Sequence, residues 1–147
     1  MTTPSLFIPI HSIKSDPALQ PGDRGERKLL VTELYTTTEK QAEDIVWHPP
    51  ATHKKCSVQV MGDTEIAVFN QHASQDRHYH KQGTEIYEVI EGIMKIFVEG
   101  DEYVLDPGDM MVVNPGAVHE VKPENTLFIC RVVTVNCKGA QDKYIVI

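Results

Sequence analysis

The sequence predicts an all-β domain of antiparallel strands with little helix. From residue 57 onward the chain is a series of short runs rich in β-branched and aromatic residues, which is the composition of strands. Four glycines recur eight residues apart within this series, at Gly92, Gly100, Gly108 and Gly116. Their neighbours include Asp-Pro-Gly-Asp and Asn-Pro-Gly, which are typical of tight turns. Short strands separated by turns at such intervals indicate a β-sandwich or β-barrel rather than a helical or alternating α/β fold.

The first part of the chain is the least regular. Four prolines lie near its start, and we expect residues 1–28 to form an extended N-terminal arm over the surface. Residues 29–35 are apolar and β-branched enough to predict a strand. Thr38, with Gln41 three residues later, predicts the start of a short helical segment that would end before Pro49.

Strand-like runs then continue to the last residues. The glycine spacing reflects hairpins and not a solenoid repeat, because the residues between the glycines do not recur. Since alternate residues of a strand point to opposite faces, half of each run is expected to fill the interior. We expect these strands at residues 57–61, 66–69, 86–90, 93–98, 103–105, 110–113, 118–121, 127–135 and 144–147.

Length and composition limit the classes of function. A chain of 147 residues favours one domain, so we expect a single domain over residues 1–147. The net charge of −7 disfavours nucleic acid and anionic membranes as partners. Three cysteines without a C-x-x-C motif favour a reducing compartment. Because the sequence also has no apolar run of bilayer length and no signal-like start, we expect a cytoplasmic protein.

A histidine-rich stretch carries the chemistry. Side chains two apart on a strand point to the same face, about 6.6 Å apart along the chain, so His78 and His80 can converge on one ion. Gly83 allows the chain to reverse, so Glu85 can open the next strand beside the two histidines. His119 follows a proline–glycine turn at the start of a later strand.

In this arrangement the sequence resembles the cupin superfamily. The first cupin motif, G-x5-H-x-H-x(3–4)-E-x6-G, matches from His78 through Glu85 to Gly92. The second motif, G-x5-P-x-G-x2-H-x3-N, matches at Gly116 and His119, with a proline beside the glycine. The resemblance covers about residues 57–135, which we expect to form the core of the barrel.

The chain departs from these motifs at three positions. His72 stands where the first motif begins with glycine, and Pro123 replaces the asparagine that ends the second. Pro115 directly precedes Gly116, without the intervening residue. None of the three is a metal ligand in the family, so the departures concern loop geometry.

The resemblance implies a jelly-roll β-barrel with one divalent metal ion held by three histidines and a glutamate. On that basis His78, His80, Glu85 and His119 are the metal ligands of this chain. Nitrogen and oxygen donors without thiolate suit Fe(II), Mn(II), Ni(II), Zn(II) or Cu(II), and do not choose among them. The resemblance also implies a homodimer, in which residues 29–35 would pair with the partner or cover a sheet edge.

Two further residues are candidates for substrate binding. Tyr87 shares a face with Glu85 and is expected to line the same cavity. Arg131 has two alternatives. If it points inward, its guanidinium could bind a carboxylate substrate. If it points outward, it is solvated and Cys130 belongs to the core.

Three functions are compatible with these sequence features. The first is a metal-dependent oxidoreductase, dioxygenase-like, that acts on a small organic molecule. The second is a non-catalytic domain that binds or senses a small ligand. The third is a cupin-type isomerase or epimerase, whose metal-free form is disfavoured by the complete set of four ligands. Fold analogy does not choose among reactions, because one architecture hosts many functions.

Overall fold

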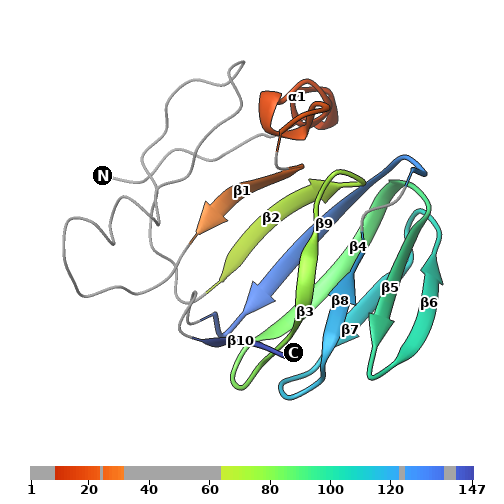
Figure 1. Cartoon of the computed structure of the whole chain (residues 1–147). Helices are drawn as coiled ribbons and strands as arrows, with labels where there is room; N and C mark the ends of the chain where they lie inside the picture. Colours follow the sequence, from red (N-terminus) through yellow and green to blue (C-terminus); the bar gives the residue numbers. More distant parts are fainter. Residues whose placement is uncertain (1–8, 24, 32–63, 123–124, 138–141) are drawn as a thin grey trace, which may run out of the picture.

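Two five-stranded antiparallel sheets pack face to face in the computed structural model (Figure 1). The structure describes residues 9–23, 25–31, 64–122, 125–137 and 142–147. The first sheet has the order β1 (Glu26–Val31), β2 (Glu65–Asn70), β9 (Phe128–Val135), β4 (Thr84–Gly92) and β7 (Met110–Val113). The second has the order β10 (Lys143–Ile145), β3 (Gln75–His80), β8 (His119–Val121), β5 (Met94–Val98) and β6 (Asp101–Leu105).

The prediction of an all-β jelly-roll fold with antiparallel strands and little helix is confirmed. The barrel is not closed, however, because the described strands hydrogen-bond within two separate sheets and not across them. The first sheet ends at β1 and β7, and the second ends at β10 and β6. The interior is therefore formed by two stacked layers, as in a double-sheet jelly roll.

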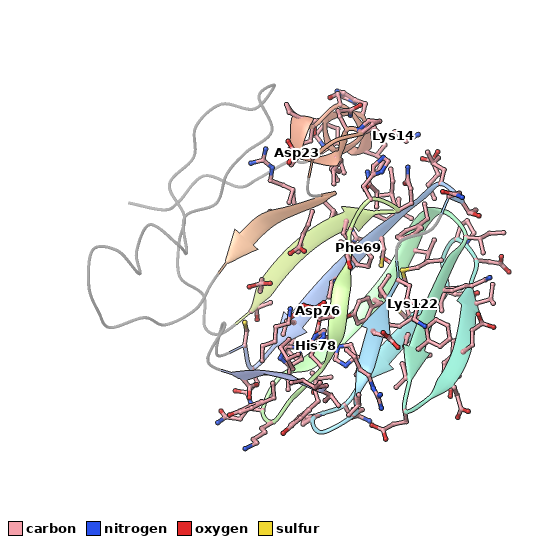
Figure 2. The ribbon with its side chains drawn as sticks, in the orientation of Figure 1. Lys14, Asp23, Phe69, Asp76, His78 and Lys122 are labelled. Carbon is pink, nitrogen blue, oxygen red and sulfur yellow. The ribbon has the colours of Figure 1, made fainter. Side chains whose placement is uncertain are left out.

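The core lies between the two sheets and draws side chains from both. Phe69 is fully buried at its centre and makes edge-to-face contacts with Tyr87 at 6.1 Å and Phe128 at 5.7 Å between ring centroids. Phe69 and His78 are buried, whereas Lys122 is exposed; all three are labelled in Figure 2. Met94 and Ile96 of β5 complete the packing from the second sheet.

The N-terminal segment differs from the extended arm expected over residues 1–28. It contains the helix α1 (Ile10–Lys14) and the 3-10 helix η1 (Pro17–Leu19). Pro9 precedes α1 and Pro17 begins η1, so each proline lies at a helix start, where its missing N–H breaks no hydrogen bond. Pro9 and Pro17, two of the prolines that predicted extended chain, therefore mark helix boundaries.

This segment is held against the outer face of the first sheet. The Asp16 carboxylate accepts a hydrogen bond from the N–H of Ala18 at 2.9 Å and pairs with Arg27 of β1 at 2.8 Å. Ile13 and Leu19 are buried. They pack in a second apolar cluster with Leu29, Val68 and Ile129. The segment thus gives the first sheet a core on both of its faces.

The predicted strand at residues 29–35 begins earlier than expected, as β1. It pairs with β2 and is itself an edge strand of the first sheet among the described strands. The rest of that strand, the strand at 57–61 and the helical segment after Thr38 lie outside the described residues. The homodimer stays a prediction. None of the helices in the described part of the chain has the length and apolar character needed to cross a bilayer.

The glycines spaced eight residues apart confirm the predicted turns, and one of them also contacts the neighbouring strand. All four have positive φ, between 73° and 89°. At Gly92, which pairs with Phe128, an added Cβ would lie 2.0 Å from the carbonyl oxygen of Leu127. At Gly100 an added Cβ would meet nothing within 4 Å.

The Gly92→Ala substitution is expected to destabilise the fold much more than Gly100→Ala. Both incur the strain of a positive φ, roughly 1 kcal/mol. Only Gly92→Ala also forces the backbone of β4 away from β9, for a total of about 3 kcal/mol or more. Denaturant unfolding of both variants measures the difference. Equal losses of unfolding free energy would contradict this account of the β4–β9 contact.

Candidate metal centre

The structure brings all four predicted ligands together between the sheets. His78 and His80 lie on β3 and His119 on β8, both in the second sheet, while Glu85 reaches them from β4 in the first. His78 and His119 are direct cross-strand partners. One potential ligand atom from each of the four side chains lies within 4.8 Å of all the others. The group is suited by this geometry to hold one ion.

One carboxylate oxygen stands at the centre of the group. Glu85 Oε1 lies 3.1 Å from Nε2 of His119 and 3.7 Å from Nε2 of His78, and closest to Nε2 of His80. The imidazole rings of His78 and His119 are 4.3 Å apart between centroids. His78, His119 and Glu85 are buried, and the His80 side chain is 15% exposed. Access to the group is therefore beside His80.

In each of the three histidines, Nδ1 points away from Glu85 and lies against a backbone carbonyl. A carbonyl oxygen can only accept a hydrogen bond, so each Nδ1 must carry a proton. In the neutral ring, Nε2 then presents its lone pair to the centre, which is the orientation of a metal-binding histidine. The pairs are His78 with the carbonyl of Asp76 at 2.5 Å, His80 with that of Asp142 at 3.0 Å and His119 with that of Ala117 at 2.9 Å.

These donors fit a divalent transition metal. Three imidazole lone pairs directed at one carboxylate oxygen repel each other and the carboxylate unless a cation lies among them. Nε2 of His80 is also buried without a hydrogen-bond partner of suitable geometry, although the carboxylate is beside it. A divalent ion would satisfy all four ligands, and nitrogen and oxygen donors suit the first-row metals named above.

Electrostatics keep the carboxylate ionised. Burial raises the pKa of Glu85, but in the metal-free protein the adjacent His119, His78 and His80 side chains, together with the positive charge of His80 when it is protonated, outweigh burial and hold that pKa well below its usual range. Burial lowers the pKa of His80, but the adjacent Glu85 carboxylate and the Asp142 carbonyl more than compensate and raise it. His80 therefore holds a proton in the metal-free protein at higher pH than an ordinary histidine does.

Tyr87 lies behind Glu85 and not on the cavity wall, where the predicted substrate-binding role requires it. The side chain is fully buried. Its hydroxyl is 3.1 Å from Glu85 Oε2 and 3.2 Å from Oε1 of Gln75. Burial, with the nearby Glu85 charge, raises the pKa of Tyr87 well above its usual range, so the hydroxyl stays protonated and can donate to the carboxylate. Tyr87 therefore orients the Glu85 carboxylate.

Arg131 takes the outward of the two predicted alternatives, so its guanidinium does not face the cavity. In β9 the even-numbered residues from Cys130 to Thr134 point inward. Arg131 pairs in register with Glu88 of β4, and the two form an ion pair on the outer face of the first sheet. Cys130 is fully buried, and burial raises the pKa of its thiol, as expected for a core residue.

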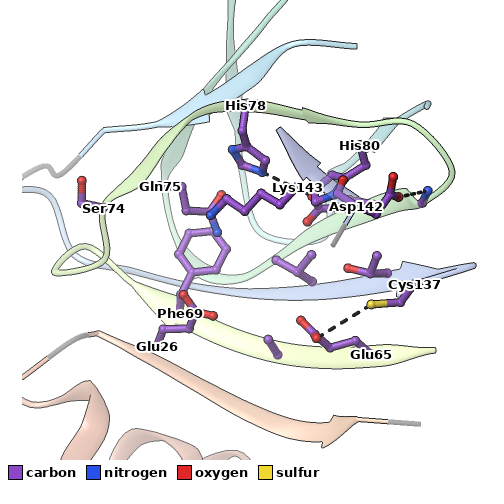
Figure 3. A pocket seen from close by; sticks show the side chains of 15 residues that line it. Glu26, Glu65, Phe69, Ser74, Gln75, His78, His80, Cys137, Asp142 and Lys143 are labelled. Carbon is purple, nitrogen blue, oxygen red and sulfur yellow. Dashed lines mark hydrogen bonds and ion pairs between the residues drawn. The ribbon is translucent and has the colours of Figure 1, made fainter. Parts of the chain in front are cut away.

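A cavity of about 220 Å³ adjoins the centre (Figure 3). His78, His80 and Glu85 form part of its wall. Figure 3 shows Phe69 and Glu26 across the cavity from His78. Most of its polar wall was not predicted from the sequence. These polar lining residues are Glu26, Glu65, Ser74, Gln75, Thr134, Asp142 and Lys143.

Two of these residues illustrate why sequence spacing missed them. Gln75 and His78 are three apart, which in a regular strand places them on opposite faces. The pairing of β3 with β8 is irregular between them, and both line the cavity. Asp142 reaches the centre from a segment 62 residues beyond His80, and no local pattern marks it.

Comparison with known families agrees with this architecture. The family described as "Cupin domain" matches residues 65–136, which include both sheets' central strands and all four candidate ligands. This chain belongs to the cupin superfamily. None of the curated proteins compared with it matches.

Solved structures similar to this cupin have diverse activities. The DMSP lyase DddQ from Ruegeria pomeroyi is 22% identical, with a TM-score of 0.45 over 52% of this chain and 41% of the lyase. The nucleoside dehydratase Pac13 from Streptomyces is 13% identical, with a TM-score of 0.45 over 56% of this chain and 68% of its own. A cupin protein from Bacteroides fragilis is 20% identical, with a TM-score of 0.44 over 57% of this chain and 78% of the Bacteroides protein. This chain thus spans less than half of the lyase, and the likeness concerns the fold alone.

Removing the tyrosine hydroxyl is expected to weaken metal binding by this cupin. Tyr87→Phe leaves Glu85 Oε2 without its tyrosine donor, and loss of such a supporting group costs about 10-fold or more in metal affinity. Tyr79→Phe is the matched control, because the Tyr79 ring stacks on Tyr144 away from the four ligands. Competition titration with Zn(II) measures both variants. Equal affinities would show that the hydroxyl does not support the carboxylate.

The stabilisation of this cupin by metal is expected to grow with pH. Metal binding needs neutral imidazoles, and the raised pKa of His80 makes protons stronger competitors. Zn(II) should therefore raise the unfolding temperature more at about pH 7.5 than at about pH 5.5. In the metal-free protein, by contrast, the stabilisation that His80 and Glu85 give each other decreases as pH rises. The attraction between His80 and Glu85 is complete below the usual histidine pKa of 6.5 and is lost as pH rises through the raised value. Thermal unfolding with and without Zn(II) tests both trends. An increase in unfolding temperature on adding Zn(II) that does not depend on pH would contradict them.

Proposed function

We propose that this cupin is a metal-dependent enzyme that transforms one small, polar organic molecule. His78, His80, Glu85 and His119 would hold the metal ion. The observation that supports this most directly is the convergence of three imidazole Nε2 atoms and a buried carboxylate at the wall of a cavity. A purely structural ion would not need an adjoining cavity.

The cavity limits the substrate to a small molecule. Its volume of about 220 Å³ is below the roughly 300–1,000 Å³ of pockets that hold drug-sized ligands. Its wall carries the carboxylates of Glu26 and Glu65 and the ammonium group of Lys143 beside apolar Phe69. Such a wall favours a polar substrate with hydrogen-bonding groups over a hydrocarbon.

The protein's own groups would orient this substrate. Gln75 lines the cavity, and its side-chain NH₂ can donate to a substrate oxygen. Tyr87 stays neutral and holds Glu85 in place. A divalent ion bound by this set supplies Lewis-acid chemistry on a substrate oxygen and, if it is redox-active, reactions with dioxygen. The buried walls would exclude water from the reacting atoms.

We propose a dioxygenase-like oxidoreductase as the first reaction class to test. A lyase or isomerase reaction at the same centre needs only Lewis-acid chemistry and is the second candidate. The two differ in a measurable way. The first requires a redox-active metal and consumes dioxygen, whereas the second proceeds with Zn(II) under nitrogen.

The deciding experiment loads the metal-free protein with Fe(II), Mn(II), Ni(II), Cu(II) or Zn(II). We expect one ion per chain by elemental analysis and turnover of a member of a panel of small phenols, diketones, thiols and sugars, measured with and without oxygen. His119→Ala should abolish both stoichiometric metal and turnover. His72→Ala is the matched control, because His72 is exposed and does not belong to the four-ligand group.

Two outcomes would contradict the proposal in different ways. Full metal content in a double variant, His78→Ala with His119→Ala, would refute the ligand assignment. Stoichiometric ligand binding without conversion by any metal form would replace the enzyme with a small-molecule binding or sensing domain.

A further inference from the structure

We propose that Asp142 is a positioning residue for the metal centre. Asp142 lies just before β10. Its side chain stabilises the turn between β3 and β4, and its backbone carbonyl holds the imidazole of His80 in its ligating orientation. This inference rests on the proposed function, because it assumes that His80 binds a metal ion. Both the side chain and the backbone of Asp142 contact the segment that carries His80.

The side chain of Asp142 caps the turn that joins two ligand-bearing strands. It accepts hydrogen bonds from the backbone N–H groups of Lys81 at 2.9 Å, Gln82 at 3.1 Å and Gly83 at 2.9 Å. Asp142 is 4% exposed, and its bond to Gly83 is buried, whereas those to Lys81 and Gln82 are partly buried. Hydrogen bonds to an ionised acceptor are about twice as strong as neutral ones. The three bonds fix the turn directly between His80 and Glu85.

The backbone of the same residue holds the imidazole. The Asp142 carbonyl accepts the hydrogen bond of His80 Nδ1 at 3.0 Å. β10 follows immediately and pairs with β3, so that Lys143 lies opposite His80 and Ile145 opposite His78. Figure 3 shows His80 and Asp142 side by side at one end of the cavity. One residue therefore controls both the backbone that carries His80 and the rotation of its ring.

The other two histidines do not depend on a distant residue in this way. His78 and His119 each bond the carbonyl two residues earlier on their own strand or turn, at Asp76 and Ala117. Such local bonds form whenever the local backbone is in place. His80 depends on a residue 62 positions away, so its orientation is lost if that segment shifts. Among the three imidazoles, His80 is the one whose ligation can be changed without altering its own strand.

The chain offers a matched control for the carboxylate. Asp109 Oδ2 accepts a hydrogen bond from the backbone N–H of Asp106 at 2.8 Å, in the turn between β6 and β7. Asp109→Asn therefore removes a carboxylate that caps a turn without touching the metal centre. If Asp142 had only a structural role, both variants would lose some stability and neither would lose metal affinity.

The test compares Zn(II) affinity in Asp142→Asn, Asp109→Asn and the wild-type chain by competition titration. An asparagine at 142 directs an NH₂ donor at backbone N–H donors, so the turn loses one or two of its bonds. We expect Asp142→Asn to bind Zn(II) about 10-fold or more weakly, and Asp109→Asn to stay within about twofold of wild type. The absorption spectrum of the Co(II)-substituted protein should also change in Asp142→Asn only. Unchanged affinity and spectrum would overturn the proposal.

A measurement on the wild-type chain covers the case in which Asp142→Asn fails to fold. Coupling is reciprocal, so metal bound at His80 should in turn stabilise the segment that holds it. Zn(II) is expected to slow amide exchange at residues 81–83 and 142–147 and to leave the turn at residues 106–109 unchanged. No change at the first two segments in the metal-loaded protein would overturn the role of Asp142. Failure of the wild-type chain to bind Zn(II) would instead overturn the proposed function and this inference with it.

Discussion

The buried carboxylate of Glu85 among three imidazoles is the constraint on which the rest of the molecule depends. An ionised carboxylate between two sheets is costly unless it is hydrogen-bonded or bound to a cation. His78, His80 and His119 supply the partners from the opposite sheet, and Tyr87 supplies a hydroxyl from the same strand. The stacking of the sheets, the pairing of β3 with β8 and the direction of every ligand must agree for this charge to be tolerated.

Much of this centre could be predicted from the sequence, because the relevant patterns are local. His78 and His80 share a face of β3 by the two-residue period of a strand, and the turn at Gly83 leads directly to Glu85 at the start of β4. Spacing predicts the correct face of β4 for Tyr87 but not its place behind Glu85, because spacing does not reveal whether a side chain lies in front of or behind its neighbour. Asp142 could not be found, because its contacts cross 62 positions of the chain.

Elsewhere the sequence left alternatives that only pairing could decide. Alternation along β9 allowed either Cys130 or Arg131 to face the core, and the register that sets Arg131 against Glu88 decides it. The prolines near the start are compatible with extended chain and equally with helix starts. The ion pair of Asp16 with Arg27 and the burial of Ile13 favour the helices. In both cases the missing information was a contact with a strand distant in sequence.

The remote contact of Asp142 has a consequence for the order in which the protein folds. Closing a loop of this length costs conformational entropy, and contacts of large sequence separation form late on average. β3 and β4 follow each other in the sequence, so they can bring three of the four candidate ligands together early, with His119 joining when β8 pairs with β3. The orientation of His80 is completed only when β10 adds to the sheet edge. A partly folded chain would therefore hold a metal ion with an incomplete or mobile set of ligands, and tight binding would report that the last strand has docked.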